Sequence, residues 1–158
     1  CILINRKFLF ANINHFIALG FGAGLFKKGP GTAGSLVAIP LFFLIINFNG
    51  YMQWLFLITL FFIGIHSSNI TCKNLKLKDP SCIVIDEIVA LIMLLLLIPI
   101  SLKNLVLGFI IFRLFDIFKP FPISWAEKKF HDGFGVMLDD ILAALFSFLI
   151  FQVIYYVF

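Results

Sequence analysis

The chain has 158 residues, of which 62% are hydrophobic and 13% are charged, and its mean hydropathy is +1.11. Soluble domains are roughly 45–50% apolar and about 25% charged, so the polar side chains are too few to cover a soluble fold of this size. The surplus of apolar surface predicts one membrane-embedded domain over residues 1–158. The aromatic residues, 17% of the chain, lie in apolar stretches suited to lipid, which argues against nucleic acid as a partner.

The first apolar stretch, residues 8–26, is the most interrupted one. Two asparagines and a histidine break it near its middle, and three glycines follow toward its end. This pattern predicts an interfacial or re-entrant helix, not a span. The same interruptions argue against a cleaved signal peptide.

The remaining apolar stretches predict an all-α, polytopic membrane helix bundle with about four or five transmembrane helices. A spanning helix needs about 20 residues, so flanking residues of the shorter stretches must lie near the membrane interface. The predicted spans are residues 36–48, 52–65, 83–100, 105–118 and 141–158.

The basic residues predict which side of the membrane each connection faces. With five alternating spans, one set of connections holds almost all the lysines, whereas the opposite set holds Lys103 alone. Cytoplasmic loops carry the excess of Lys and Arg, so the lysine-rich set is predicted to face the cytoplasm. That set contains Lys27, Lys28, Lys73, Lys76, Lys78, Lys119, Lys128 and Lys129.

The first acidic motif is DPSCIVIDE, residues 79–87. Its proline and serine suit a helix start with Ser81 as the cap, which places Asp86 and Glu87 one turn further in. The helix dipole stabilises acidic side chains near a helix N-terminus. Two adjacent acids among aliphatic residues are more than this effect explains. Because a carboxylate at membrane depth costs about 2.5–3.5 kcal/mol, the pair predicts a functional site.

The second motif is FRLFDIFKPFP, residues 112–122. Arg113, Asp116 and Lys119 recur every three residues and share one helix face until Pro120 ends the helix. Arginine can fork onto phosphate oxygens, and aspartate can hold a metal ion. The alternative, an Arg113–Asp116 pair that neutralises itself in the membrane, is compatible with that function.

The third motif is HDGFGVMLDD, residues 131–140. Its glycines predict a flexible turn into the last helix, which Asp139 and Asp140 then open. Acids in a first helical turn are common, so this motif gains weight only because it lies on the same predicted face as the other two. His131 could carry protons, although a loop histidine is more often solvated.

The fourth motif, GPGTAGS at residues 29–35, precedes the first predicted span. A glycine-rich loop that leads into a helix N-terminus offers N–H groups to an anion. It is not a nucleotide P-loop, because no lysine follows Gly34. Taken alone it is a loop with a serine cap, but Lys27 and Lys28 beside it could attract phosphate or anionic lipid headgroups.

Cysteine chemistry is not predicted. The three cysteines form neither a disulfide framework nor a zinc spacing. A cysteine phosphatase needs an arginine six positions after its nucleophile, where this chain has Lys78 and Ile88.

Four stretches in this order, PGTAGSLVAIP, IVIDEIVA, FRLFDIFKPFPI and HDGFGVMLDD, resemble the bacterial phosphatidylglycerophosphatase A family over about residues 20–144. The resemblance implies a magnesium-dependent phosphoric monoester hydrolase. Its substrate would be phosphatidylglycerophosphate in the cytoplasmic leaflet of the inner membrane, and its product phosphatidylglycerol. Ala90 and Ala144 stand where the family usually has glycine, and both still allow close helix approach.

The acidic motifs and the resemblance together give a predicted active site. Mg²⁺ binds carboxylate oxygens, and clustered acids repel one another unless a cation lies among them. The ion would offset phosphoryl charge and activate a water, and either that water or an aspartate would attack the phosphorus. The predicted metal ligands, direct or through water, are Asp86, Glu87, Asp116 and Asp140; these four with Arg113 and Asp139 form the catalytic set, and Thr32, Ser35, Arg113 and Lys119 bind phosphate.

Two other functions compete with this prediction. A CDP-alcohol phosphotransferase is suggested by Asp132 and Gly133, but no Ala-Arg follows them. A small ion or metal transporter would also carry intramembrane carboxylates, but its acids should lie part-way through the bilayer or on both sides. Metal-dependent phosphate release from lipid, compared with ion flux in vesicles, separates these functions.

Overall fold

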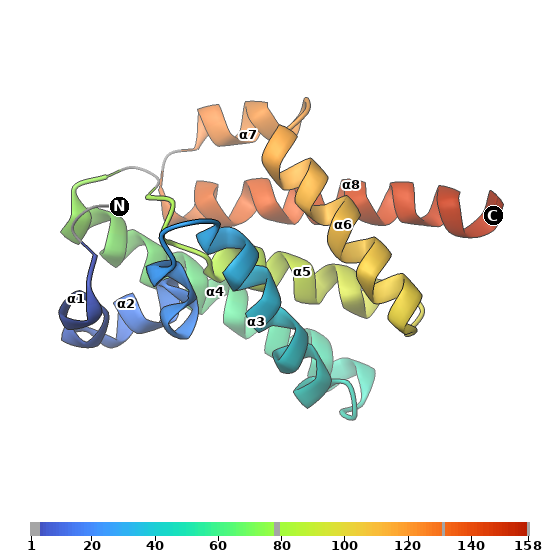
Figure 1. Cartoon of the computed structure of the whole chain (residues 1–158), viewed down its shortest axis with the longest axis horizontal. Coiled ribbons are helices and arrows are strands. Elements are labelled where there is room, and N and C mark those ends of the chain that lie inside the picture. The colour runs from blue at the N-terminus through green and yellow to red at the C-terminus, as the bar shows by residue number, and fades with distance from the viewer. Residues whose placement is uncertain (1–3, 78–79, 131, 158) are drawn as a thin grey trace.

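A computed structural model describes residues 4–77, 80–130 and 132–157, and within these ranges the chain is helical with no strand. The predicted all-α class is therefore confirmed. Figure 1 shows the elements, which in chain order are α1 (Arg6–Ala11), α2 (Ile13–Ala18), η1 (Gly20–Leu25), α3 (Pro30–Ile45), α4 (Gly50–Leu75), α5 (Ile85–Leu97), α6 (Leu102–Phe118), α7 (Ile123–Lys129) and α8 (Gly133–Val157).

The N-terminal stretch forms three short helices where one was predicted. Asn12 ends α1 and begins α2, and its side chain accepts a hydrogen bond from the Asn14 N–H at 2.9 Å. His15 is buried and attaches α2 to α4 through contacts of 3.0 Å with Thr71 Oγ1 and 3.0 Å with the Asn74 amide nitrogen. The polar residues that break the apolar pattern thus cap one helix and hold another in place.

Helices α3 and α5 begin at other residues than predicted. Pro30 takes the first position of α3, where a proline loses no helical hydrogen bond, so the helix starts before the predicted residue 36 and includes the glycine-rich motif. Ser81 does not cap α5; the helix starts at Ile85 after Val84, and the Val84 N–H donates to the Ala18 carbonyl at 3.0 Å. Asp86 and Glu87 therefore lie in the first turn of α5.

Helix α8 also starts earlier than predicted, at Gly133, so its glycines are helical and do not form a flexible turn. The Gly133 N–H donates to the Asn69 side chain at 2.7 Å, and a Cβ at Gly133 would lie 2.4 Å from the Ile65 carbonyl oxygen. Glycine thus allows α8 to pack directly on α4. Asp139 and Asp140 consequently lie in the second turn of α8 and do not open the helix.

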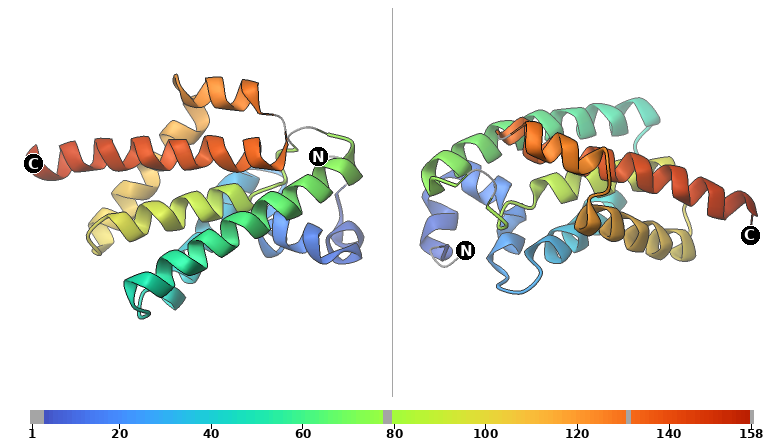
Figure 2. Two further views of the ribbon diagram at one scale, coloured as in Figure 1. Left: turned by 180° about the vertical axis from the view of Figure 1, so that it is seen from behind. Right: turned by 90° about the horizontal axis from the view of Figure 1, so that it is seen from above.

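Helix α5 lies at the centre of the bundle and contacts α3, α4, α6 and α8 (Figure 1, Figure 2). Ten of its 13 residues are buried, which agrees with an apolar sequence on every face of the helix. Its most extensive contact is with α8, and Ala90 on α5 and Ala144 on α8 are both fully buried. Small side chains at these positions fit close approach of helices.

The outer surface is suited to lipid. Helices α4 and α8 have 26 and 25 residues, with mean hydropathies of 1.7 and 2.0, and each is long and apolar enough to cross a membrane. Large apolar side chains such as Phe62 and Val153 are more than 60% exposed on these helices. Both features indicate a membrane-associated protein.

Candidate active site

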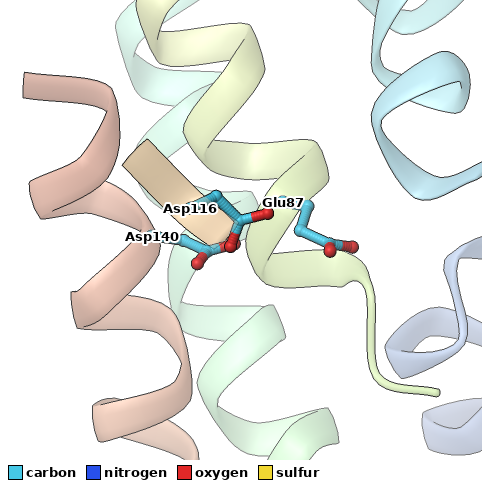
Figure 3. A group of neighbouring side chains, drawn as sticks. All are labelled: Glu87, Asp116 and Asp140. Atoms are coloured by element: carbon cyan, nitrogen blue, oxygen red, sulfur yellow. The ribbon is translucent and has the colours of Figure 1, made fainter. Parts of the chain in front are cut away.

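Three carboxylates from three helices meet at one end of the bundle. Glu87 comes from the first turn of α5, Asp116 from the last turns of α6 and Asp140 from the second turn of α8. One carboxylate oxygen of each residue lies within 4.8 Å of the others (Figure 3). The predicted convergence of the three acidic motifs is therefore confirmed for these residues, which we call the carboxylate group.

The carboxylate group is largely shielded from solvent. Asp140 is 2% exposed, and its Oδ2 atom and the Oε2 atom of Glu87 are buried without a hydrogen-bond partner. The Asp140 carboxylate also lies in the field of Asp86 and Asp139 in addition to the other two members. Buried carboxylates at such separations repel one another, and removal from water is costly without a compensating charge. The three acids are therefore a candidate cation site.

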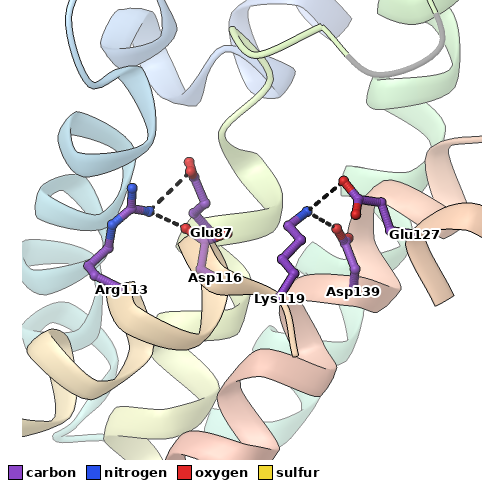
Figure 4. A network of polar contacts seen from close by, with 6 residues as sticks. All are labelled: Glu87, Arg113, Asp116, Lys119, Glu127 and Asp139. Carbon is purple, nitrogen blue, oxygen red and sulfur yellow. Dashed lines mark hydrogen bonds and ion pairs between the residues drawn. The ribbon is translucent and has the colours of Figure 1, made fainter. Parts of the chain in front are cut away.

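Arg113 supplies part of that charge. Its Nη1 atom lies 3.2 Å from Glu87 Oε1 and 2.5 Å from Asp116 Oδ2 (Figure 4). The ion pair with Asp116, considered above as an alternative, is thus present and is extended to Glu87. One guanidinium alone cannot neutralise three carboxylates when all three are ionised.

Lys119 forms a second ion-pair network beside the first (Figure 4). It follows α6 in a left-handed conformation with φ of 40°, pairs with Asp139, and lies 3.4 Å from Glu127 Oε1 on α7. Burial alone lowers the pKa of Lys119, but the Asp139 carboxylate outweighs that effect and raises the pKa above its ordinary value. Lys119 is therefore a fixed cation.

Two glycines of α3 form a slot for the Glu87 side chain. A Cβ at Gly31 would lie 1.8 Å from Glu87 Oε1, and a Cβ at Gly34 would lie 3.0 Å from Glu87 Oε2. Only glycines let the carboxylate lie this close to the α3 backbone, where the positive end of the helix dipole favours it. The sequence shows their spacing of three residues, but the motif was interpreted as a loop, so this contact was missed.

The other predicted site residues are placed differently. Asp86 is buried but outside the group whose oxygens lie within 4.8 Å. Ser35 is buried and its hydroxyl donates to the Gly31 carbonyl at 3.0 Å within α3, whereas Thr32 is exposed. Their phosphate-binding roles stay predictions. His131, Lys78 and Asp79 lie outside the described residues. Glu127 was missed because α7 was not predicted.

A helical, membrane-associated fold that holds buried carboxylates beside an arginine and a lysine fits a membrane enzyme acting on a phosphorylated substrate. The chain belongs to the phosphatidylglycerophosphatase A family, whose profile matches residues 16–155. No solved structure matches the chain.

Three relatives match most of the chain. It is 36% identical to phosphatidylglycerophosphatase A of Haemophilus influenzae, over 96% of this chain and 94% of the relative. It is 37% identical to phosphatidylglycerophosphatase A of Escherichia coli K12, over 84% of this chain and 78% of the relative. It is also 37% identical to a putative phosphatidylinositol-3-phosphatase of Bacteroides thetaiotaomicron, over 87% of this chain and 90% of the relative.

Proposed function

We propose that this protein is a lipid phosphatase that hydrolyses the terminal phosphomonoester of phosphatidylglycerophosphate, giving phosphatidylglycerol and inorganic phosphate in phospholipid biosynthesis. The observation that carries the proposal is the carboxylate group of Glu87, Asp116 and Asp140 with Arg113 beside it. Two relatives of similar length bear the name of this activity.

The carboxylate group offers donors of the kind that suit Mg²⁺. Its ligand atoms are all oxygens, the hard donors that this ion prefers, and two of the buried oxygens have no hydrogen-bond partner. We propose that Glu87, Asp116 and Asp140 bind Mg²⁺ directly and that Asp86 acts through a water. When bound, the ion would offset charge on the phosphoryl oxygens and lower the pKa of a bound water.

The basic residues have two roles in this proposal. Arg113 holds Glu87 and Asp116 in place before substrate arrives, and its guanidinium then forks onto phosphoryl oxygens. Lys119 pairs with Asp139, and an N–H of its ammonium group that Asp139 does not use would donate to an oxygen of the transferred phosphoryl group. The ester bond between phosphorus and the glycerol oxygen breaks, and that oxygen takes up a proton. The attacking group is either a water, which gives inorganic phosphate directly, or an aspartate of the site, in which case a water then hydrolyses the phosphoaspartate to release phosphate.

The proposed topology places α3, α4, α5, α6 and α8 as four to five spans in the inner membrane, with the active site facing the cytoplasm. The native residues Cys72 and Cys82 are buried, so they are poor probes of sidedness. Single cysteines at the exposed positions Lys28 and Lys103, in a cysteine-free background, are better. An impermeant thiol reagent should label only the Lys103→Cys protein once the outer membrane is permeable. Labelling of Lys28→Cys from outside would contradict the topology.

The activity is tested by phosphate release from phosphatidylglycerophosphate in detergent, with Mg²⁺, with EDTA and with Mg²⁺ restored. We expect release that requires the ion, and no release by the Asp140→Asn variant. Phosphatidylinositol 3-phosphate should be tested in parallel because of the Bacteroides relative. Absence of lipid hydrolysis together with ion flux in reconstituted vesicles would favour the transporter.

A further inference from the structure

A groove of about 990 Å³ opens between the N-terminal helices and α3, outside the carboxylate group. Its walls are mostly apolar and include Leu9, Phe21, Leu36 and Pro40. Two cations, Arg6 and Lys28, also line it, and both are exposed. The groove thus combines an apolar wall with a pair of positive charges.

The groove and the carboxylate group lie on two sides of the same turn of α3. Gly29 and Thr32 line the groove. Gly31, which lies between them in sequence, is buried against Glu87. A Cβ added at Gly31 would lie 1.8 Å from Glu87 Oε1. A helix with its side chains is about 10 Å across, so a molecule reaching around the start of α3 can occupy both places.

The far wall of the groove is held in an uncommon conformation. Gly20, Phe21 and Gly22 in η1 have φ values of 55°, 58° and 106°, a left-handed region that a phenylalanine rarely adopts. This wall packs closely against the segment that precedes α5, since a Cβ at Gly24 would lie 1.9 Å from the Cys82 carbonyl oxygen. Phe21 is nonetheless 45% exposed. Backbone strain of this kind clusters where ligands bind.

We propose that this groove binds the phosphatidyl part of an anionic phospholipid. An acyl chain lies against the apolar wall, and the phosphodiester lies between Arg6 and Lys28. The argument is one of charge complementarity. A phosphodiester carries one negative charge, arginine and lysine both bind its oxygens, and an anionic phospholipid has no cationic headgroup to offset that charge. The assignment of that lipid as the substrate rests on the proposed function. Phosphatidylglycerophosphate then has two recognised phosphates, the monoester at the carboxylate group and the diester in the groove.

Binding is tested with nitroxide-labelled phosphatidylglycerol and phosphatidylcholine in vesicles that contain the full chain. We expect the wild-type protein to immobilise the anionic lipid preferentially. The Arg6→Gln/Lys28→Gln variant should lose about tenfold in relative affinity, as expected for a lost charge-assisted contact. The matched control, Lys7→Gln/Lys103→Gln, removes two exposed cations that do not line the groove and should retain the preference.

A second variant, Ala33→Trp, fills the groove without a change of charge, because Ala33 lines it. It should reduce immobilisation of phosphatidylglycerol as well. In kinetic assays, the Arg6→Gln/Lys28→Gln variant should raise the KM for phosphatidylglycerophosphate much more than it lowers kcat. Inhibition by inorganic phosphate should not change, because the proposed function places free phosphate at Arg113 and the bound ion, outside the groove.

The outcomes separate this proposal from the proposed function. Unchanged preference for phosphatidylglycerol in the Arg6→Gln/Lys28→Gln variant, with lipid hydrolysis intact in the wild type, would overturn the groove assignment alone. An equal loss in the control variant would also overturn it, because the effect would then belong to overall charge. Selective binding that depends on Arg6 and Lys28, without any lipid hydrolysis, would support the groove and remove the proposed function.

Discussion

Replacement of Gly31 by alanine tests whether the position of the Glu87 carboxylate matters for activity. The added Cβ would lie 1.8 Å from Glu87 Oε1, whereas ordinary contact begins at 3.4 Å. The carboxylate must therefore move by about 1.6 Å, the difference between these two distances. Because Arg113 Nη1 lies only 3.2 Å from the same oxygen, this movement also disturbs the ion pair that fixes Glu87.

The expected loss of activity is large and the expected loss of stability is small. A displacement of about 1 Å in a catalytic group costs about 100-fold in rate, or about 2.7 kcal/mol of transition-state stabilisation. In contrast, alanine is favoured over glycine in a helix by about 1 kcal/mol, which offsets part of the weakened ion pair. The variant should therefore stay folded while kcat/KM falls.

Gly50→Ala is the matched control, because Gly50 is also in the first turn of a helix and a Cβ there meets nothing within 4 Å. The assay compares phosphate release from phosphatidylglycerophosphate with thermal unfolding in detergent for both variants. Equal activity of the two variants would refute the reasoning, because Glu87 could then move by more than 1 Å without consequence.

Three further predictions concern charge. Arg113→Lys should stay folded but lose roughly 2–4 kcal/mol of transition-state stabilisation, because lysine lacks the planar fork, and near-normal kcat/KM would make Arg113 structural. Asp140→Asn should lower activity by at least ~100-fold. It should also raise the unfolding temperature in EDTA, because a buried charge is removed, and abolish stabilisation by Mg²⁺. An Asp140→Asn protein whose unfolding temperature still rises with Mg²⁺ would contradict this. Burial lowers the pKa of His15 below its ordinary 6.5, so the stability of the α2–α4 contact should be present above about pH 6.5 and be lost as pH falls through the lower, folded-state pKa. Hydrogen-exchange protection of α1 and α2, corrected for the intrinsic pH dependence of exchange, should fall at acidic pH in the wild type and change less in His15→Gln.

The helical class and the convergence of Glu87, Asp116 and Asp140 could be predicted from the sequence because they depend on apolar length and alternation of sides. The helix starts were predicted less well. Pro30 at the first position of α3 is a local signal that the interpretation as a loop overlooked. The start of α8 at Gly133 involves packing against α4, and such a contact between distant segments leaves no local pattern.

The same limit applies to individual site residues. Arg113 and Asp116 pair on one face of α6 as predicted. Lys119 does not share that face, because it follows the helix in a left-handed conformation and pairs with Glu127 from a helix that was not predicted. Ser35 suited a phosphate site by sequence, although its hydroxyl bonds within its own helix. The slot at Gly31 and Gly34 depends on how α3 meets α5, which only tertiary packing determines.

The composition of the carboxylate group has a consequence for biosynthesis. Glu87 and Asp116 emerge from the ribosome well before Asp140, which belongs to the last of the described helices. Until α8 enters the membrane, the nascent chain has only two of the three acids and Arg113 pairs with both of them. A chain truncated before α8 is therefore expected to stay inert in the bilayer, and hydrolysis of lipid begins only after synthesis has passed residue 140.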